Sequence, residues 1–178
     1  MPVSDLHGFT PIMNEVALLA PKTVLELGIG FGLYGVVCRQ VLDAQWGRIK
    51  PESWTATIAG VESFGAYRNP AWELYDVVTD IDFTETVEPL HGWDLVMMID
   101  SLEHLTPDVG RPFLRALVKN NKHIIVSVPN GVMPQGEVYG NPHEAHLWTF
   151  NGVEEFEPYK FELLHQAVCT VVSIEGEG

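Results

Sequence analysis

Cysteine and basic residues are both scarce in this chain of 178 residues. The two cysteines, Cys38 and Cys169, are too few and too far apart for a disulfide framework, so both are expected to be buried thiols of a reducing compartment. Ten Lys and Arg residues stand against 24 Asp and Glu residues, a formal net charge of −14. Such a balance repels phosphate backbones, and it therefore disfavours a nucleic-acid substrate.

Long apolar runs are also missing. No stretch of about 18 apolar residues occurs, so no membrane span is expected. The amino-terminal residues do not combine a basic segment with an apolar one, which predicts a cytoplasmic protein without a signal peptide. Composition is that of a soluble globular protein and shows no break or repeat, so one domain is expected over residues 1–178.

Apolar periodicity and turn residues predict alternating strands and helices. Helices are expected at 11–19, 33–42, 70–75 and 107–120, with a shorter one at 149–156. Strands are expected at 23–27, 55–61, 76–79, 94–99 and 123–128, with two more within 161–174, and loops at 43–53 and 131–146. This alternation predicts a doubly wound α/β fold, a mostly parallel sheet with helices on both faces.

The most informative segment is the apolar run TVLEL at 23–27, followed by three glycines and an apolar helical pattern. Gly28, Gly30 and Gly32 lack a Cβ and tolerate positive φ, so the backbone there can approach a nucleotide-like ligand. Glu26 precedes the first glycine, at the end of the expected strand. A carboxylate in that place suits a ligand with positive charge.

Acidic residues also follow the other expected strands: Glu62, Asp80 or Asp82, and Asp100. In doubly wound sheets, ligands bind beyond the carboxyl ends of the strands. Glu62 is therefore placed to accept hydrogen bonds from ribose hydroxyls.

Taken together, these segments resemble the class I S-adenosylmethionine-dependent methyltransferases. The resemblance is carried by LELGIGFG at 25–32, GVES at 60–63, DLVMMIDSLEHL at 94–105 and the pair Pro129-Asn130. It implies a Rossmann-like methyltransferase fold and S-adenosylmethionine as the cofactor. The three glycines would pass close to the methionine part, and Glu26 would sit beside its cationic end, directly or through water.

The same resemblance implies contacts along the rest of the cofactor. Glu62 would hold the ribose, and Ser63 or Phe64 would border the adenine. Asp82, followed by Phe83, is the first choice for the residue that meets the adenine amino group.

Asp80 is the second choice for the adenine amino group. Asp100 and Ser101 would line the wall near the sulfonium.

His104 is the candidate catalytic base, because the ordinary pKa of imidazole lies near working pH. The alternative is that Glu103 and His104 only shape the start of a helix.

A divalent-metal site is a further alternative, although none is assigned. Asp100, Glu103 and His104 lie at i, i+3 and i+4, and His143 and His146 follow in a loop. Some ubiquinone-biosynthesis and small-RNA O-methyltransferases look similar here, with a divalent metal. Such a set of donors suits Zn²⁺, Mn²⁺ or Mg²⁺.

The sequence thus predicts methyl transfer to a small-molecule acceptor, whose identity and methylated atom stay open. One rival is a nicotinamide-dependent oxidoreductase, since residues 30–35 also satisfy G-x-G-x-x-G. The other is a catalytically silent partner subunit, since a fold alone does not establish activity.

Overall fold

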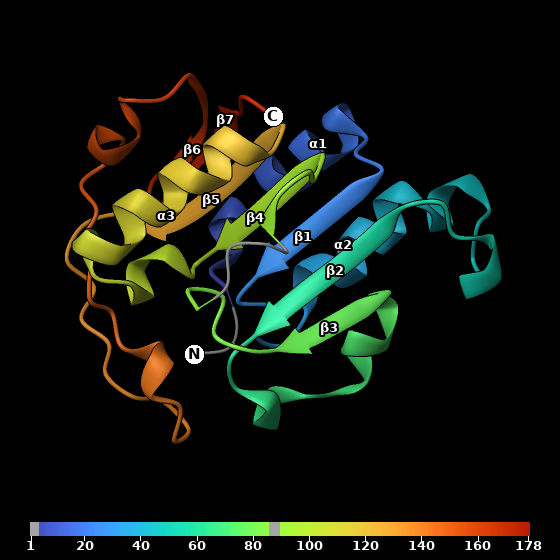
Figure 1. Cartoon of the computed structure of the whole chain (residues 1–178), viewed down its shortest axis with the longest axis horizontal. Helices are drawn as coiled ribbons and strands as arrows, with labels where there is room; N and C mark the ends of the chain where they lie inside the picture. Colours follow the sequence, from blue (N-terminus) through green and yellow to red (C-terminus); the bar gives the residue numbers. More distant parts are fainter. Residues whose placement is uncertain (1–3, 86–89) are drawn as a thin grey trace.

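A seven-stranded sheet forms the centre of the protein in a computed structural model that describes residues 4–85 and 90–178 (Figure 1). The strand order is β3-β2-β1-β4-β5-β7-β6. Strands β1 to β5 run parallel, while β7 pairs antiparallel with both β5 and β6. The strands are β1 Thr23–Leu27, β2 Thr57–Glu62, β3 Val77–Asp80, β4 Leu95–Ile99, β5 His123–Pro129, β6 Phe161–Gln166 and β7 Cys169–Glu175.

Helices cover both faces of this sheet, which confirms the doubly wound class. Helices α1 (Phe9–Leu19) and α2 (Leu33–Leu42) pack on one face, where Val24 of β1 belongs to their apolar cluster. Helix α3 (Pro107–Asn120) packs on the other face with Leu25 and Leu27 of the same strand. Successive side chains of a strand point to opposite faces, so one five-residue strand serves both cores.

The boundaries of α2 and α3 agree with the sequence prediction because their signals are local. Helix α2 begins directly after Gly32, whose φ of 90° ends the preceding turn. Helix α3 starts with Pro107, at a position where a missing N–H costs little. Its buried residues Phe113, Leu114, Leu117 and Val118 recur at helical spacing and face the sheet.

Strand β2 begins at Thr57, two residues later than expected. The backbone N–H and the hydroxyl of Thr55 both donate to Oδ1 of Asp43, at 2.8 and 3.0 Å. Asp43 is fully buried and also accepts from Arg39 and Arg48. These bonds hold Thr55 outside the sheet.

Two other expected elements differ in kind. Residues Pro70–Leu74 form a 3-10 helix rather than an α-helix, and the helix expected at 149–156 is reduced to a 3-10 turn at Glu154–Phe156. Phe150 is instead buried, and its carbonyl accepts a hydrogen bond from Gly131 N at 2.7 Å. The start of that segment is therefore tied to the end of β5.

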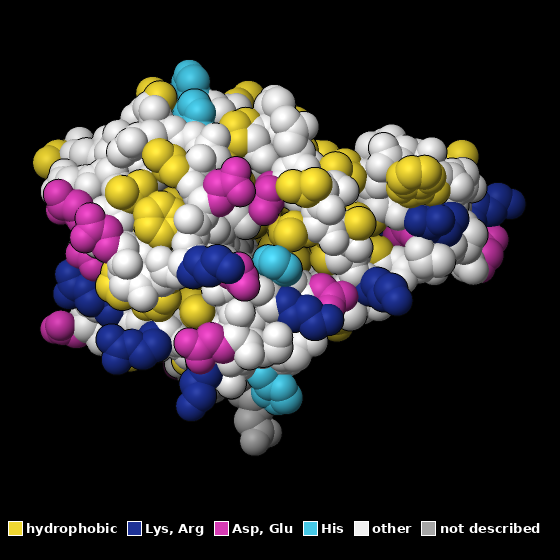
Figure 2. Space-filling view, turned by 90° about the horizontal axis from the view of Figure 1, so that it is seen from above, with side chains coloured by type: hydrophobic (Ala, Val, Ile, Leu, Met, Phe, Trp, Pro, Cys, Tyr) yellow, Lys and Arg dark blue, Asp and Glu magenta, His cyan; other side chains and the backbone are white. Residues whose placement is uncertain are grey.

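Surface features agree with the composition. Residues 43–53, expected as a loop, contain two short 3-10 turns and project from one end of the molecule (Figures 1 and 2). On the face in Figure 2, basic and acidic side chains are interspersed and do not form one continuous basic patch. Within residues 4–85 and 90–178, no helix has the length and apolar character needed to cross a bilayer.

Cys38 and Cys169 are both buried and free, as expected.

Gly35, inside α2, provides a test of this packing. A Cβ at this position would lie 2.0–2.4 Å from three atoms of the buried Tyr75 side chain. Gly35→Ala should therefore lower the free energy of unfolding by about 1–3 kcal/mol through overpacking, although alanine ordinarily favours a helix by about 1 kcal/mol.

Urea unfolding measures this change. Gly136→Ala is the control, because its Cβ would meet no atom within 4 Å. A Gly35→Ala protein as stable as the wild type would contradict the packing described here.

Candidate functional site

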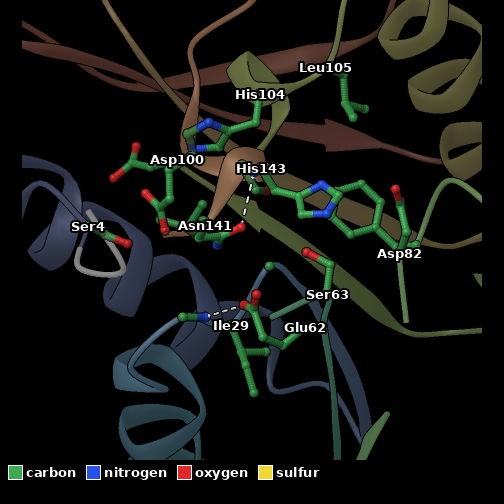
Figure 3. A pocket seen from close by; sticks show the side chains of 16 residues that line it. Ser4, Ile29, Glu62, Ser63, Asp82, Asp100, His104, Leu105, Asn141 and His143 are labelled. Carbon is green, nitrogen blue, oxygen red and sulfur yellow. Dashed lines mark hydrogen bonds between the residues drawn. The ribbon is translucent and has the colours of Figure 1, made fainter. Parts of the chain in front are cut away.

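A cleft of about 700 Å³ opens at the carboxyl ends of β1, β2 and β4 (Figure 3). Most cofactor-site residues expected from the sequence line it: Gly28, Gly30, Glu62, Ser63, Asp82, Phe83, Asp100 and Ser101, with the catalytic candidate His104. The remaining lining residues are Ser4, Ile29, Ile99, Leu105, Asn141, His143 and Glu144. We call this hollow the cofactor cleft.

Glycine is required in the loop after β1 for two reasons, its backbone conformation and its lack of a side chain. Gly28 and Gly30 have φ values of 78° and 49°, which side chains rarely adopt. A Cβ on Gly28 would also lie 2.9 Å from Cβ of Ser101 at the end of β4. The loop and the residue after β4 therefore approach each other across the floor of the cleft.

Glu62 joins this loop to the end of β2. Its Oε2 accepts a hydrogen bond from Gly30 N at 2.8 Å, and its Oε1 accepts one from Phe64 N at 3.0 Å. Burial raises the pKa of Glu62, and these backbone N–H groups oppose that rise. Each carboxylate oxygen keeps a second lone pair, so Glu62 can still accept hydrogen bonds from a diol in the cleft.

Glu26 and Gly32 do not line the cleft, in contrast to the other predicted cofactor residues. Glu26 points to the α2 face of the sheet, opposite to Leu25 and Leu27, and its Oε2 accepts from the Tyr75 hydroxyl at 2.6 Å. Tyr75 in turn accepts from Gly35 N at 3.1 Å. Direct contact between Glu26 and a ligand is not supported by this arrangement.

Asp82 and Phe83 line the cleft, whereas Asp80 does not. Oδ1 of Asp82 accepts from both the N–H and the hydroxyl of Thr84, at 2.8 and 2.7 Å. This small turn fixes the carboxylate at the cleft wall. Of the two acids considered from the sequence, Asp82 is thus the one that lines the cleft.

Asp100 and Ser101 form the wall after β4. Asp100 has a φ of 50°, and its Oδ1 and Oδ2 accept from the Ser127 hydroxyl and from Asp5 N, at 2.8 and 2.9 Å. Burial raises the pKa of Asp100, and the bonds to its carboxylate oppose that rise. The Ser101 hydroxyl is buried and has no hydrogen-bond partner within residues 4–85 and 90–178, so it is free to meet a ligand.

His104 lies beside His146, with ring centroids 5.0 Å apart. Nδ1 of His104 is 3.1 Å from the Ala145 carbonyl, and Nδ1 of His146 is 2.6 Å from the Met133 carbonyl. Since a carbonyl only accepts, each Nδ1 carries the proton and each Nε2 of the neutral ring keeps its lone pair. Burial lowers the pKa of His104, which favours this neutral form.

Glu103 completes a compact group with these two histidines. One ligand atom from each of Glu103, His104 and His146 lies within 4.8 Å of the others. Leu147 N and Trp148 N both donate to the Glu103 carbonyl, at 2.8 and 3.1 Å, and so bring the later histidine to this place.

Asp100 and His143, two other members of the set considered from the sequence, lie outside this group. His143 lines the cofactor cleft and points toward Asp82 (Figure 3).

A turn at Asn141–Glu144 also lines the cleft, a position that the sequence analysis did not predict. The Tyr67 hydroxyl donates to Oε1 of Glu144 at 2.9 Å, and Asn141 Nδ2 lies 3.3 Å from the same hydroxyl. Asn141 Oδ1 accepts from His143 N, and Pro142 occupies the first position of the turn. The pair Asn-Pro is a local signal for such a turn, but its position above the cleft depends on the fold.

The glycine loop, Glu62 and the acids after β3 and β4 together define a Rossmann-like ligand site at the carboxyl edge of a doubly wound sheet. No protein-family profile matches the sequence, and no curated protein matches it. Solved structures do match in fold; of the three reported below, one holds bound SAH and the other two are methyltransferases by name.

The amino-terminal domain of EvdMO1 with bound SAH (S-adenosylhomocysteine) has a TM-score of 0.64 and 17% identity, over 95% of this chain and 80% of that one. The methyltransferase domain of a bacterial CtHen1 has a TM-score of 0.63 and 17% identity, over 96% of this chain and 100% of that one. An O-methyltransferase family protein from Burkholderia thailandensis has a TM-score of 0.63 and 12% identity, over 95% of this chain and 56% of that one. The chain therefore has the class I methyltransferase fold.

The buried Glu26 predicts a pH-dependent stability. Burial raises the pKa of Glu26 to about 8, above the ordinary value of 4.5 that it regains on unfolding. The folded state thus holds a proton that the unfolded state releases, and stability falls as pH rises from 4.5 through 8. Glu26→Gln should remove this dependence and gain on the order of a few kcal/mol relative to the wild type between pH 5 and pH 8.

Urea unfolding at several pH values checks this prediction. Glu52→Gln, at an exposed position, is the control and should track the wild type. Parallel curves for the wild type and Glu26→Gln would show that Glu26 is ionised in the fold.

Proposed function

We propose that the protein transfers a methyl group from S-adenosylmethionine to a small-molecule acceptor. The proposal is supported most by Glu62, a buried carboxylate that shapes the glycine loop and keeps lone pairs toward the cleft. The resemblance of the sequence motifs and the fold shared with SAH-bound EvdMO1 agree with it. In this proposal Glu62 holds the ribose, and Asp82 with Phe83 borders the adenine.

In this proposal, residues that follow β4 take part in the methyl transfer. A methyl group on a cationic sulfonium needs little activation, so the protein mainly aligns the acceptor and removes its proton. Nε2 of His104 carries a lone pair and lines the cleft beside Asp100. We assign His104 as the base and Ser101 as a hydrogen-bond partner for the cofactor.

The group of Glu103, His104 and His146, which we call the polar corner, has a second candidate role, the binding of a divalent cation. Its donor atoms fit such an ion. Glu103, His104 and His146 would hold it, with each imidazole oriented by a backbone carbonyl bound to Nδ1. Such a cation would supply Lewis-acid activation of an acceptor hydroxyl.

The oxidoreductase alternative is weaker in this structure. The glycine series that satisfies its motif starts only at Gly30, whereas the glycine turn after β1 already begins at Gly28. A silent partner subunit would keep the cofactor cleft but transfer no methyl group.

Cofactor binding tests the central claim. Wild-type protein should bind SAH in calorimetry and show no comparable affinity for NADH. Glu62→Ala should weaken SAH binding by about 10- to 100-fold, because it removes charged hydrogen bonds and loosens the loop. Glu52→Ala, which changes an exposed glutamate, should bind SAH as the wild type does. Absence of SAH binding to the wild type would refute the proposal.

Substitution of His104 separates binding from chemistry. With the best acceptor from a broad small-molecule panel, His104→Ala should lower kcat by about 10²- to 10⁴-fold and leave SAH affinity near the wild-type value. Unchanged turnover would remove His104 from the mechanism.

His146→Ala distinguishes the two roles of the corner. If His104 acts only as a base, the purified protein contains no stoichiometric metal and chelator leaves its activity intact. If the corner holds a cation, His146→Ala lowers both the metal content and the activity.

A further inference from the structure

A second cavity, of about 1030 Å³, adjoins the cofactor cleft and shares Ser4, Asp100 and His104 with it. We call it the acceptor cavity, and the inference below rests on the proposed function. Its other walls come from the amino-terminal segment, the end of β5 and the segment after it, and the start of β7: Asp5, Leu6, His7, Glu103, Pro129, Met133, Gln135, His146, Val168 and Cys169.

The polar corner of this cavity offers hydrogen-bond acceptors. Oε2 of Glu103 is buried and has no hydrogen-bond partner in the described ranges, and the Glu103 side chain lines the cavity. In the neutral tautomer in which Nδ1 of His104 donates to the Ala145 carbonyl, Nε2 of His104 is a further acceptor. A ligand hydroxyl placed in this corner can donate to one of these acceptors. A hydroxyl oxygen would equally serve as a ligand if a cation occupied the corner.

The remaining walls are largely apolar. Leu6, Met133 and Val168 stand at the rim with exposed fractions of 69%, 43% and 42%, and Pro129 and Cys169 lie behind them. Apolar walls around a few convergent polar groups are typical of small-molecule sites. They indicate a ligand with a hydrophobic body.

The charged residues around the cavity disfavour an anionic acceptor. All ten Lys and Arg residues lie within the described ranges, and none of them lines either hollow. Asp5, Asp100 and Glu103 are the acidic residues that line the acceptor cavity. A carboxylate or phosphate held there would have no Lys or Arg side chain as partner, only the imidazoles of His7, His104 and His146, and burial of a poorly paired anion is costly.

We propose that the acceptor is an uncharged alcohol or phenol with a hydrophobic body, methylated on its hydroxyl oxygen. The new bond joins this oxygen to the methyl carbon, the bond from methyl carbon to sulfur breaks with its electron pair left on sulfur, and SAH leaves uncharged at sulfur. The hydroxyl proton passes to a neutral acceptor atom of the polar corner, for which Nε2 of His104 is the first choice.

Three matched probes test this inference on SAH-loaded protein by NMR titration. They are 4-ethylphenol, its methyl ether 4-ethylanisole, and the anionic 4-hydroxyphenylacetate. The phenol should bind most tightly. The ether, which cannot donate, and the anion, which finds no Lys or Arg partner, should each bind about tenfold more weakly or worse.

Variants at the rim place the binding in this cavity. Val168→Trp should abolish 4-ethylphenol binding by filling the entrance, whereas Val109→Trp, at a position 44% exposed on α3, should not. Met133→Lys should improve binding of 4-hydroxyphenylacetate relative to the phenol by supplying a cation, and Val109→Lys should leave the ratio unchanged.

Three results would overturn the inference: equal affinity for the phenol and the anion, no binding of 4-ethylphenol at all, or binding unaffected by Val168→Trp. The SAH titration of the same samples tests the proposed function separately. Protein that binds SAH but prefers the anion keeps the methyltransferase proposal and loses this acceptor class.

Discussion

The shape of the cofactor cleft depends on the carboxylate of Glu62. This side chain is 5% exposed, and its two oxygens accept from Gly30 N and Phe64 N. One acceptor thereby fixes two backbone segments that leave neighbouring strands, β1 and β2. Without it, the part-buried N–H group of Gly30 would lose its hydrogen-bond partner, which destabilises the loop. The residue that shapes the loop also lines the cleft, so the form of the loop and the chemistry of the cleft wall both depend on Glu62.

The parallel strands bring the other polar groups to this place. Because β1, β2 and β4 are neighbours in the sheet, their carboxyl ends meet at one edge. Tight turns there give each side chain a definite direction, as the φ of 50° at Asp100 illustrates. Pairing of Asp100 with Ser127 and with Asp5 N then ties the end of β4 to β5 and to the amino-terminal segment. The two hollows meet at this junction.

Local signals explain what the sequence predicted well. The glycine loop and the limits of α2 and α3 are encoded by adjacent residues, and most of the predicted cleft residues follow strands directly. The direction of Glu26 was less predictable, because its partner Tyr75 is 49 residues away. The meeting of His146 with His104 likewise depends on hydrogen bonds from Leu147 and Trp148 to the Glu103 carbonyl. Such long-range contacts leave no periodic pattern in the chain.

The segment from Gly131 to Trp148 is a wall common to both hollows, and it is anchored at both ends. Gly131 N bonds to the Phe150 carbonyl, and His146 N bonds to the Gln135 carbonyl. Its outermost residues, 136 and 137, are exposed, and a Cβ on Gly136 meets nothing within 4 Å. Changes of chain length should therefore be tolerated near Gly136, while an insertion between Asn141 and His146 should displace residues that line both hollows. The length of this short stretch of chain therefore sets the shape of both hollows at once.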